Sequence, residues 1–263
     1  MNYAKVCEIF RTLALTSGEV IMDFYNSNKF EVLLKSDDSP VTVADKKADE
    51  LISRGLKKYF PEIPVITEEQ VKSHDLNASV FFIVDPLDGT KEFIKRRGDF
   101  TVNIALVAQG KPIRGIVYAP ARQRLFYTNE NGEAVEEMAY FSVSKLGLIK
   151  KIKTALSDNT ALKIVASKSH RDKNTDRYIS KYRYKELVSA GSSLKFCLIA
   201  TGEADLYPRF GPTMEWDTAA GHAVLSAAGG SVLQVEDKQP LKYGKPNYKN
   251  PFFIASSKNV ILK

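Results

Sequence analysis

A hydrophobic run that passes directly into two aspartates, VFFIVDPLDGT at residues 80–90, is the stretch that indicates most about the fold. Its first five residues are all apolar and predict a buried strand. Asp85 and Asp88 lie three residues apart on the turn that leaves this strand, so their carboxylates can converge on one point. Such carboxylates suit hard divalent cations, and Mg²⁺ typically takes a few of them together with waters and phosphate oxygens. The alternative is an ordinary turn, because Asp-Pro and Asp-Gly are common turn dipeptides.

The chain around this stretch predicts an antiparallel lobe. Apolar spacing predicts two amphipathic helices followed by five strands, at residues 3–25, 42–59, 65–66, 80–84, 100–107, 113–118 and 124–128. Turn residues at 109–112 and 131–132 separate the later strands, which favours a meander. Residues 130–160 are polar with few strong signals, and we interpret them as a junction between two lobes.

The second half of the chain changes to alternating strands and helices. Strands are predicted at 163–166, 187–188, 204–207, 231–235 and 252–255, with helices at 192–201 and 218–228. Gly229 and Gly230 close the last helix. We therefore predict an N-terminal α+β lobe with a largely antiparallel sheet, residues 1–155, and a C-terminal α/β lobe, residues 156–263.

Length and composition are those of an ordinary globular protein. The chain has 263 residues, of which 44% are hydrophobic and 26% charged, enough for one large core or two lobes. No apolar stretch approaches the ~18 residues that span a bilayer, and the N-terminal pattern predicts a mature helix rather than a signal peptide. Cys7 and Cys197 lack metal-type or redox-type spacing, so we predict buried thiols in a reducing, cytoplasmic compartment.

The net charge of +7 suits an anionic partner: a nucleic acid, a membrane surface or a phosphorylated metabolite. Solubility alone is the alternative, and we interpret the basic run Lys91, Lys95, Arg96 and Arg97 as a solvated face. The sequence lacks the HExxH, GxSxG, GxxxxGKS/T, GxGxxG and DxDxT patterns, so covalent catalysis is disfavoured. It also lacks the interleaved basic and aromatic residues of single-strand binders, so no stable nucleic-acid complex is expected.

Further acidic residues lie at the ends of predicted elements. Glu68 and Glu69 follow a predicted strand, Asp217 precedes a predicted helix, and Asp45 lies near the start of another. Taken singly, each has an ordinary alternative: a solvated loop for the glutamates, an N-cap for Asp217 and a helix-start carboxylate for Asp45. Together with the aspartates of the DPLDGT turn, they form a pattern suited to a centre that binds several metal ions.

With these sites in order, the chain resembles the inositol monophosphatase superfamily of lithium-sensitive phosphatases. The composite motif of that superfamily is matched, in sequence order, by Asp45, Glu68-Glu69, residues 85–90, Trp216-Asp217 and Gly229-Gly230. The resemblance spans nearly the whole chain. It implies an α/β (α+β) fold in the form of a layered α-β-α-β-α sandwich, with the site between two lobes.

Within the superfamily, the chain looks most like the bacterial 3′(2′),5′-bisphosphate nucleotidases of the CysQ type. The stretches that carry this closer likeness include KSDDSPVTVAD (35–45), DPLDGTKEFIKR (85–96), SKSHR (167–171) and GSSLKFCLIATGEADLYPRFGPTMEWDTAAGHAV (191–224). Inositol phosphatases usually carry an acidic residue near the position of Arg209. We infer that Arg209 replaces a contact to an inositol hydroxyl with a contact to a phosphate, which suits a substrate with two phosphates.

The resemblance implies a role for each matching residue. Two or three Mg²⁺ would be held by Glu68, Asp85, Asp88, Asp217 and the carbonyl of Leu87. Asp45 and Thr90 would orient the attacking water, and the amides of Gly89 and Thr90 would hold the phosphate that is cleaved. The substrate and its second phosphate would be contacted by His170, Ser192, Lys195, Arg209 and Asp217. For His170 and Lys195, the alternatives are an ordinary surface or core histidine and a solvated helix position.

The implied function is Mg²⁺-dependent, lithium-sensitive hydrolysis of the 3′-phosphate of 3′-phosphoadenosine 5′-phosphate (PAP), giving AMP and phosphate in sulfur metabolism. The sulfated nucleotide PAPS, converted to APS, is a second candidate substrate. An inositol monophosphatase or sugar bisphosphatase with the same metal site is one alternative. A non-catalytic anion-binding or nucleic-acid-binding protein is another. The expected location is the cytoplasm, with weak association at the cytoplasmic membrane face and the oligomeric state left open.

Overall fold

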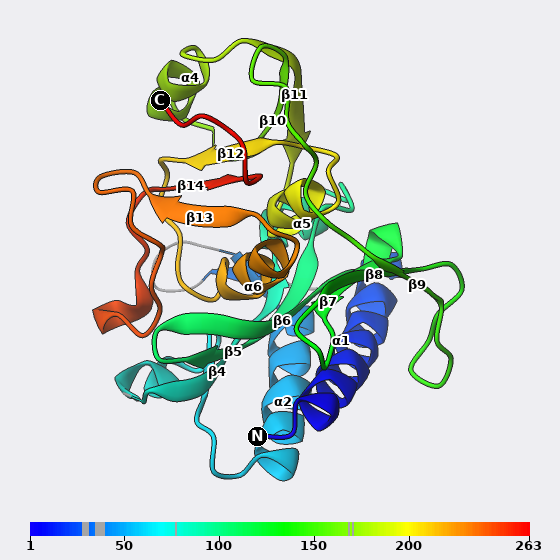
Figure 1. Cartoon of the computed structure of the whole chain (residues 1–263). Helices are drawn as coiled ribbons and strands as arrows, with labels where there is room; N and C mark the ends of the chain where they lie inside the picture. The colour runs from blue at the N-terminus through cyan, green and yellow to red at the C-terminus, as the bar shows by residue number, and fades with distance from the viewer. Residues whose placement is uncertain (28–31, 35–39, 77, 168, 170) are drawn as a thin grey trace.

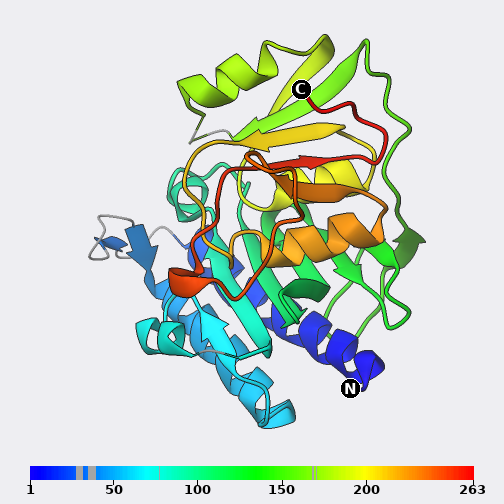
Figure 2. The same cartoon turned by 60° about the vertical axis from the view of Figure 1, so that its left-hand side comes forward.

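The computed structural model describes residues 1–27, 32–34, 40–76, 78–167, 169 and 171–263. Two large sheets alternate with layers of helices, and the layers follow one another from the bottom to the top of Figure 1. The first layer holds the N-terminus and the last lies near the C-terminus; Figure 2 shows the same stack after a 60° turn.

The first layer is a pair of packed helices, α1 (Tyr3–Asn26) and α2 (Val43–Tyr59), which confirms the two helices predicted there. The Asn2 side chain caps α1 by accepting a hydrogen bond from the Lys5 amide over 3.1 Å. A reciprocal capping box of Thr42 and Asp45 starts α2. Both helices bury an apolar face against the first sheet, where the rings of Phe10 and Phe82 meet edge to face with 5.6 Å between centroids.

The first sheet has seven strands in chain order: β3 (Val65–Thr67), β4 (Val80–Asp88), β5 (Thr101–Ala108), β6 (Lys111–Ala119), β7 (Arg124–Thr128), β8 (Ala134–Met138) and β9 (Leu148–Lys151). Strands β3 and β4 are parallel, and every later pair is antiparallel. Helices cover both faces, which is why the first five residues of β4 form a continuous apolar run rather than an alternating one.

Strands β8 and β9 fall in residues 130–160, which the sequence had indicated only as a polar lobe junction, so that interpretation was incomplete. The apolar signal of β8 is interrupted by Glu136 and Glu137, which are nevertheless buried. Arg11 of α1 binds Glu137 through two hydrogen bonds of 2.7 and 2.8 Å, and Arg124 of β7 binds Glu136 over 2.6 Å. These pairings are invisible to a local pattern because the partners lie 126 and 12 residues away.

The middle layer consists of α5 (Leu194–Ala200) and α6 (Ala219–Ala227). A second sheet lies above it with strand order β11-β10-β12-β14-β13, built from β10 (Leu162–Ser167), β11 (Tyr184–Ala190), β12 (Leu206–Arg209), β13 (Ser231–Gln234) and β14 (Phe253–Ser256). Helix α6 lies very close to β6: a Cβ on Gly115 would stand 2.6 Å from the Ala220 carbonyl oxygen. Glycine is therefore required at position 115 for the helix to approach the sheet.

The outermost layer is α4 (Lys173–Ile179), a helix that was not predicted from the sequence. Its Tyr178 and Ile179 pack with Ile164 and Leu206 on the outer face of the second sheet. The smaller elements are β1 (Val32–Leu34), β2 (Pro40–Thr42), α3 (Thr90–Ile94), η1 (Val71–Asp75), η2 (Pro120–Arg122) and η3 (Pro246–Tyr248). The stack is thus α-β-α-β-α, which confirms the predicted fold class.

One continuous core joins the two sheets through the middle layer. Phe81 and Val117 of the first sheet belong to the same buried cluster as Phe196 and Val224 of the middle helices and Phe253 of the second sheet. The first sheet ends at Lys151 and the second begins at Leu162, and the proposed lobe boundary at residue 155 lies between them.

Two further features bear on the sequence predictions. Within the described part of the chain, none of the helices combines the length and the hydropathy that crossing a bilayer requires.

Both cysteines are free thiols, but only Cys197 is buried, whereas Cys7 is half-buried. The prediction of two buried thiols was therefore wrong for Cys7, whose thiol donates to the Thr128 carbonyl of β7 over 3.2 Å but keeps part of its surface exposed.

Candidate active site

Three carboxylates from three separate segments meet at one edge of the first sheet. Glu68 follows β3, Asp85 lies in β4, and Asp217 precedes α6, yet one oxygen of each lies within 4.8 Å of the others. The first two are neighbours because β3 and β4 are parallel and end side by side, and the Glu68 amide donates to the Val84 carbonyl over 3.1 Å. The middle layer supplies the third. Such a group of oxygen donors suits a hard divalent cation.

An irregularity in β4 directs the two aspartates of the DPLDGT turn to different places. The register of β4 against β5 shifts between Asp85 and Asp88, which is a bulge of the kind that re-aims side chains beside active sites. Asp85 is 1% exposed, and its Oδ1 accepts a hydrogen bond from the Leu87 amide over 3.1 Å. The Leu87 carbonyl oxygen lies 3.2 Å from the Thr90 hydroxyl, whose single proton has a second, charged acceptor in Asp45.

Asp88 lies outside the group of three among the residues that the structure describes. Its carboxylate faces the middle layer, where the backbone N–H of Ser193 donates to it and the Lys195 ammonium attracts it. Loss of solvation raises the pKa of Asp88 to about 6; the Lys195 charge opposes that rise and the Glu68 charge adds to it. Asp88 is therefore electrostatically part of the cluster, although its oxygens do not join the shared point.

Asp217 does not cap α6, because the N-cap of that helix is Thr218. Its Oδ2 instead accepts a hydrogen bond from the Met214 amide over 2.8 Å. Burial raises the pKa of Asp217 well above its usual range, and the nearby charges of Asp88 and Glu68 raise it further. Carboxylates that repel one another in a buried place are the donor set that a divalent cation would neutralise, so these residues fit a metal centre.

Asp45 has two partners, one on each carboxylate oxygen. Its Oδ2 accepts the amide and the hydroxyl of Thr42 over 2.8 and 2.5 Å, which is the capping box of α2. Its Oδ1 accepts the Thr90 hydroxyl over 3.1 Å. Asp45 is therefore both a helix-start carboxylate, which was the ordinary alternative, and a partner of Thr90 in the candidate site. Burial raises the pKa of Asp45, with the hydrogen bonds from Thr42 and Thr90 opposing the rise.

Gly89 connects these residues through a backbone conformation that other amino acids avoid. Its φ is +90°, and a Cβ there would lie 2.9 Å from the Asp99 carbonyl oxygen. Both observations explain a glycine directly after Asp88. The binding of a phosphate by the Gly89 and Thr90 amides stays a prediction.

The cationic side of the site comes from the second half of the chain. Lys195 of α5 is 4% exposed, so the alternative of a solvated helix position is wrong. Its Nζ donates to the Ser192 carbonyl and lies 5.2 Å from the ring centroid of Tyr207. Burial lowers the pKa of Lys195 to about 8, and the Asp88 charge opposes that fall.

Arg209 and Ser192 complete the cationic side. Arg209, at the end of β12, is 7% exposed, donates to the Pro212 carbonyl over 2.9 Å and lowers the pKa of Asp217 by its charge. Ser192 has a φ of +53°, an unusual conformation for a residue other than glycine, and its hydroxyl lies 2.5 Å from that of Thr101. His170 lies outside the described residues, so its predicted role stays a prediction.

Several buried polar residues near the site were missed by the sequence analysis. Thr101 and Asn103 of β5 form a hydrogen-bonded network with Ser193. Asp49 of α2 accepts the Gln70 amide over 2.7 Å, in the loop that carries Glu68. Two signals could have found them: polar residues two apart in an apolar strand, and a carboxylate one helical turn after Asp45 on the same face.

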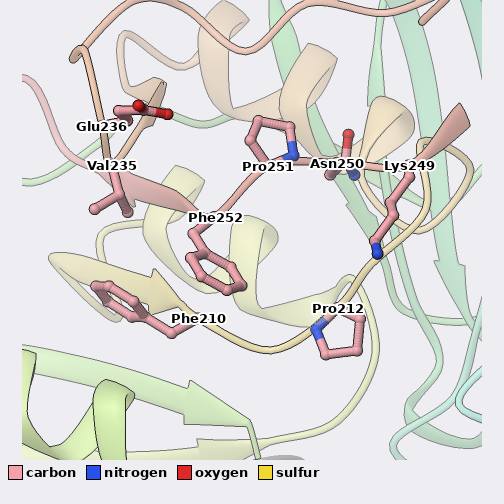
Figure 3. Close-up of a pocket in the computed structure, with 8 residues that line it drawn as sticks. All are labelled: Phe210, Pro212, Val235, Glu236, Lys249, Asn250, Pro251 and Phe252. Atoms are coloured by element: carbon pink, nitrogen blue, oxygen red, sulfur yellow. The ribbon is translucent and has the colours of Figure 1, made fainter. Parts of the chain in front are cut away.

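A cavity of about 510 Å³ adjoins the loop between Arg209 and Asp217 (Figure 3). The residues that line it are Phe210, Pro212, Val235, Glu236, Lys249, Asn250, Pro251 and Phe252. The rings of Phe210 and Phe252 pack beside each other in its wall, with 5.7 Å between centroids and a tilt of 41°. None of the lining residues that the structure describes belongs to the predicted site, so this cavity is a neighbour of the carboxylate centre rather than part of it.

The site combines carboxylates that suit metal cations with the buried side chains of Lys195 and Arg209, whose positive charges suit phosphate. This combination, in a five-layer sandwich, defines a site of the phosphatase type. Residues 2–261 match the model of the Inositol monophosphatase family. The chain belongs to that family. The predicted resemblance is thereby confirmed, and with it the prediction of a phosphatase.

Relatives and solved structures agree with this assignment. The chain is 44% identical to the 3′(2′),5′-bisphosphate nucleotidase CysQ of Escherichia coli (strain K12), over 96% of this chain and 98% of that protein. It is similar to the crystal structure of CysQ from Bacteroides thetaiotaomicron, with a TM-score of 0.85, 39% identity and 98% of each chain covered. An inositol monophosphatase from Zymomonas mobilis shares the fold at 23% identity, with a TM-score of 0.78 and 99% and 96% coverage.

Proposed function

We propose that the chain is a Mg²⁺-dependent 3′(2′),5′-bisphosphate nucleotidase that hydrolyses the 3′-phosphate of PAP to AMP and phosphate. The observation that carries the proposal is the approach of three carboxylates to within 4.8 Å beside the buried Lys195 and Arg209. The names of the similar CysQ proteins support the same substrate class. PAPS is a second proposed substrate, and a cytoplasmic role in sulfur metabolism belongs to the same proposal.

The residues that would hold the cations are Glu68, Asp85, Asp88, Asp217 and the Leu87 carbonyl. When bound, Mg²⁺ supplies positive charge to the phosphate oxygens and acidity to a coordinated water. The chain's own contribution starts at Thr90, whose hydroxyl donates to Asp45 and therefore presents its oxygen as an acceptor. A water that donates to Thr90 is oriented by this pair.

Asp45 is suited to receive a proton through Thr90, because the Thr90 oxygen takes the proton of the water while its own hydroxyl proton passes to Asp45 Oδ1. Its buried carboxylate has a raised pKa, which makes it a better base than an exposed aspartate. As the water oxygen bonds to phosphorus, the bond from phosphorus to the 3′-oxygen breaks and its electron pair leaves with that oxygen. The 3′-oxygen then takes a proton from solvent, so that AMP and phosphate are the products.

Selection of a substrate with two phosphates is proposed to depend on Arg209 and Lys195. A guanidinium can bind a phosphate through two parallel hydrogen bonds, whereas an ammonium acts as a point charge. Both side chains are buried next to the carboxylates, which reduces screening by water. A sugar with one phosphate would use only part of this surface.

Phosphate release from a substrate panel tests the proposal. The panel contains PAP, PAPS, inositol 1-phosphate and fructose 1,6-bisphosphate, each measured with Mg²⁺ and with a chelator. The expected result is Mg²⁺-dependent release that is fastest from PAP. Preference for inositol 1-phosphate or fructose 1,6-bisphosphate would favour the alternative sugar phosphatase. No release from any of the four would instead favour a non-catalytic anion-binding protein.

A further inference from the structure

A buried network of hydroxyl and amide groups lies between β5 and the start of α5. The Thr101 hydroxyl lies 2.5 Å from that of Ser192 and 2.9 Å from that of Ser193, and it donates to Asn103 Oδ1 over 3.2 Å. The Ser193 hydroxyl donates to the same Oδ1 over 2.6 Å. Thr101, Asn103 and Ser193 are at most 1% exposed, so these three side chains are closed to solvent, whereas Ser192 is half-buried.

The network leaves Asn103 one orientation. Its Oδ1 is taken by two hydroxyl donors, so the Nδ2 group must point the other way, toward Asp88 Oδ2 at 3.5 Å. A flipped amide would set its oxygen against the carboxylate oxygen, which is repulsive. The amide is therefore held as a donor to the carboxylate.

The Asp88 carboxylate accepts hydrogen bonds from two layers, the first sheet and the middle helices. Asn103 comes from the first sheet, where Thr101 is the Cα partner of Asp88 in the β4–β5 ladder. The Ser193 backbone N–H comes from the start of α5 in the middle layer. Because Asp88 lies outside the point shared by Glu68, Asp85 and Asp217, some other contact must decide where its carboxylate points.

We propose that Asn103 is a positioning residue that, locked by Thr101 and Ser193, orients the Asp88 carboxylate toward the cation it binds. This inference rests on the proposed function, since it takes Asp88 to be a metal ligand. Groups that hold a metal ligand in place by hydrogen bonds typically contribute 10- to 100-fold to metal affinity. Asn103 lies 15 residues after Asp88 and is not one of the residues of the composite superfamily motif.

A double-mutant cycle on metal-free protein tests the proposal. Mg²⁺ affinity is measured by titration calorimetry for the wild type, Asn103→Ala, Asp88→Asn and the double variant. Asn103→Ala is expected to weaken Mg²⁺ binding about 10- to 100-fold. On the Asp88→Asn background, the same change is expected to weaken it less than about twofold, because Asn103 acts through Asp88. An equal loss on both backgrounds, or no loss on either, overturns the proposal.

A pair of threonine variants separates positioning from a general cost to the fold. Thr101→Val removes a hydroxyl from the network, whereas Thr128→Val removes one from the same sheet, where it accepts the Gly115 amide over 3.0 Å. Both threonines are buried. We expect weaker Mg²⁺ binding for Thr101→Val and unchanged binding for Thr128→Val, with thermal unfolding followed for both. Equal Mg²⁺ affinities for the two variants contradict the proposal.

The same data keep the two proposals apart. If the wild type binds no Mg²⁺, or Asp88→Asn binds as tightly as the wild type, the metal role of Asp88 in the proposed function fails. If the wild type and Asp88→Asn differ as expected but Asn103→Ala matches the wild type, only the positioning role fails. Kinetics with PAP add a second check: the loss in Asn103→Ala should be recovered in part by raising the Mg²⁺ concentration.

Discussion

The Thr90 hydroxyl donates to Asp45 Oδ1 over 3.1 Å, which ties the turn after β4 to the first turn of α2. The same Asp45 closes the capping box with Thr42 through its other oxygen. One carboxylate therefore fixes a helix start and orients a hydroxyl in the site. Because Asp45 is held by both contacts, the pair of Asp45 and Thr90 has a fixed geometry before any substrate is bound.

The Thr90–Asp45 pair predicts a loss in the chemical step. Thr90→Val and Asp45→Asn should each lower kcat for PAP by about 10²- to 10⁴-fold, since they remove the oriented water or its base. KM should change little. Thr90→Ser is the matched control, because it keeps the hydroxyl, and it should retain most of the activity. A Thr90→Val enzyme with wild-type kcat would refute the role of the pair.

Burial of the carboxylates, together with their mutual repulsion, predicts an unusual pH dependence of stability. A carboxyl whose pKa is higher in the folded state binds more protons when folded, so metal-free protein loses stability as pH rises through that range. For Asp88 the range runs from the ordinary value of 3.8 to about 6. Asp217→Asn should relieve the repulsion and raise the Tm of metal-free protein above that of the wild type by about a few degrees.

Thermal unfolding in a chelator between pH 4 and pH 8 checks this expectation. The Tm difference between Asp217→Asn and the wild type should be small at the acidic end and grow as pH rises. Added Mg²⁺ should stabilise the wild type more than the variant, because it supplies the missing positive charge. A Tm difference that is the same at every pH would contradict the raised pKa of Asp217.

Arg209 predicts a difference between substrates. Arg209→Glu should lower kcat/KM for PAP far more than for a substrate with one phosphate, since a hydrogen bond to a charged group is worth about 1.5–3 kcal/mol. That range corresponds to about a tenfold to 150-fold loss. Arg209→Lys keeps the positive charge but loses the two parallel N–H donors of the guanidinium. Its kcat/KM for PAP should therefore lie between those of the wild type and Arg209→Glu. Equal losses on PAP and inositol 1-phosphate would remove Arg209 from the selection of the second phosphate.

Lithium inhibition is expected from the family to which the chain belongs. Li⁺ is a small hard cation that takes oxygen ligands, and it should compete for part of the carboxylate centre. Turnover of PAP measured at rising LiCl, with KCl at equal ionic strength as the control, should fall in the LiCl series alone. Activity that stays constant in both series would contradict a lithium-sensitive site.

The buried pair of Arg11 and Glu137 predicts a large effect on folding. Glu137→Gln leaves the Arg11 guanidinium buried without its counter-charge, which should reduce the free energy of unfolding by about 3–5 kcal/mol. Glu133→Gln is the control, because the pair of Glu133 and Lys151 is exposed and should matter little. Chemical denaturation measures both. Similar midpoints for the two variants would show that the buried pair does not support the strand.

Elements with a strong local pattern were predicted from the sequence. The apolar face of α2 recurs at Ala44, Ala48, Ile52 and Leu56, and the cap that starts the helix is written in Thr42 and Asp45. The continuous apolar run of β4 indicated a strand covered on both faces. Such features depend on neighbours in the chain, so composition and spacing are enough to find them.

Elements stabilised by distant partners were not predicted. Strand β8 carries Glu137, whose burial makes sense only when Arg11 is in place 126 residues earlier in the chain. Helix α4 has seven residues, too few for a clear period. The half-burial of Cys7 likewise depends on which face of α1 meets the sheet.

The sequence by itself determined the layered fold, the family motif and the candidate ligands, because each is recorded in local spacing or in an ordered set of short motifs. The tertiary structure alone decided which carboxylates share a point. It brought Glu68, Asp85 and Asp217 together and turned Asp88 toward α5. It also placed the Asn103 amide 3.5 Å from the Asp88 carboxylate. The physical reason is that bulges, sheet register and buried hydrogen bonds join residues far apart in the chain, and a linear pattern carries no record of those distances.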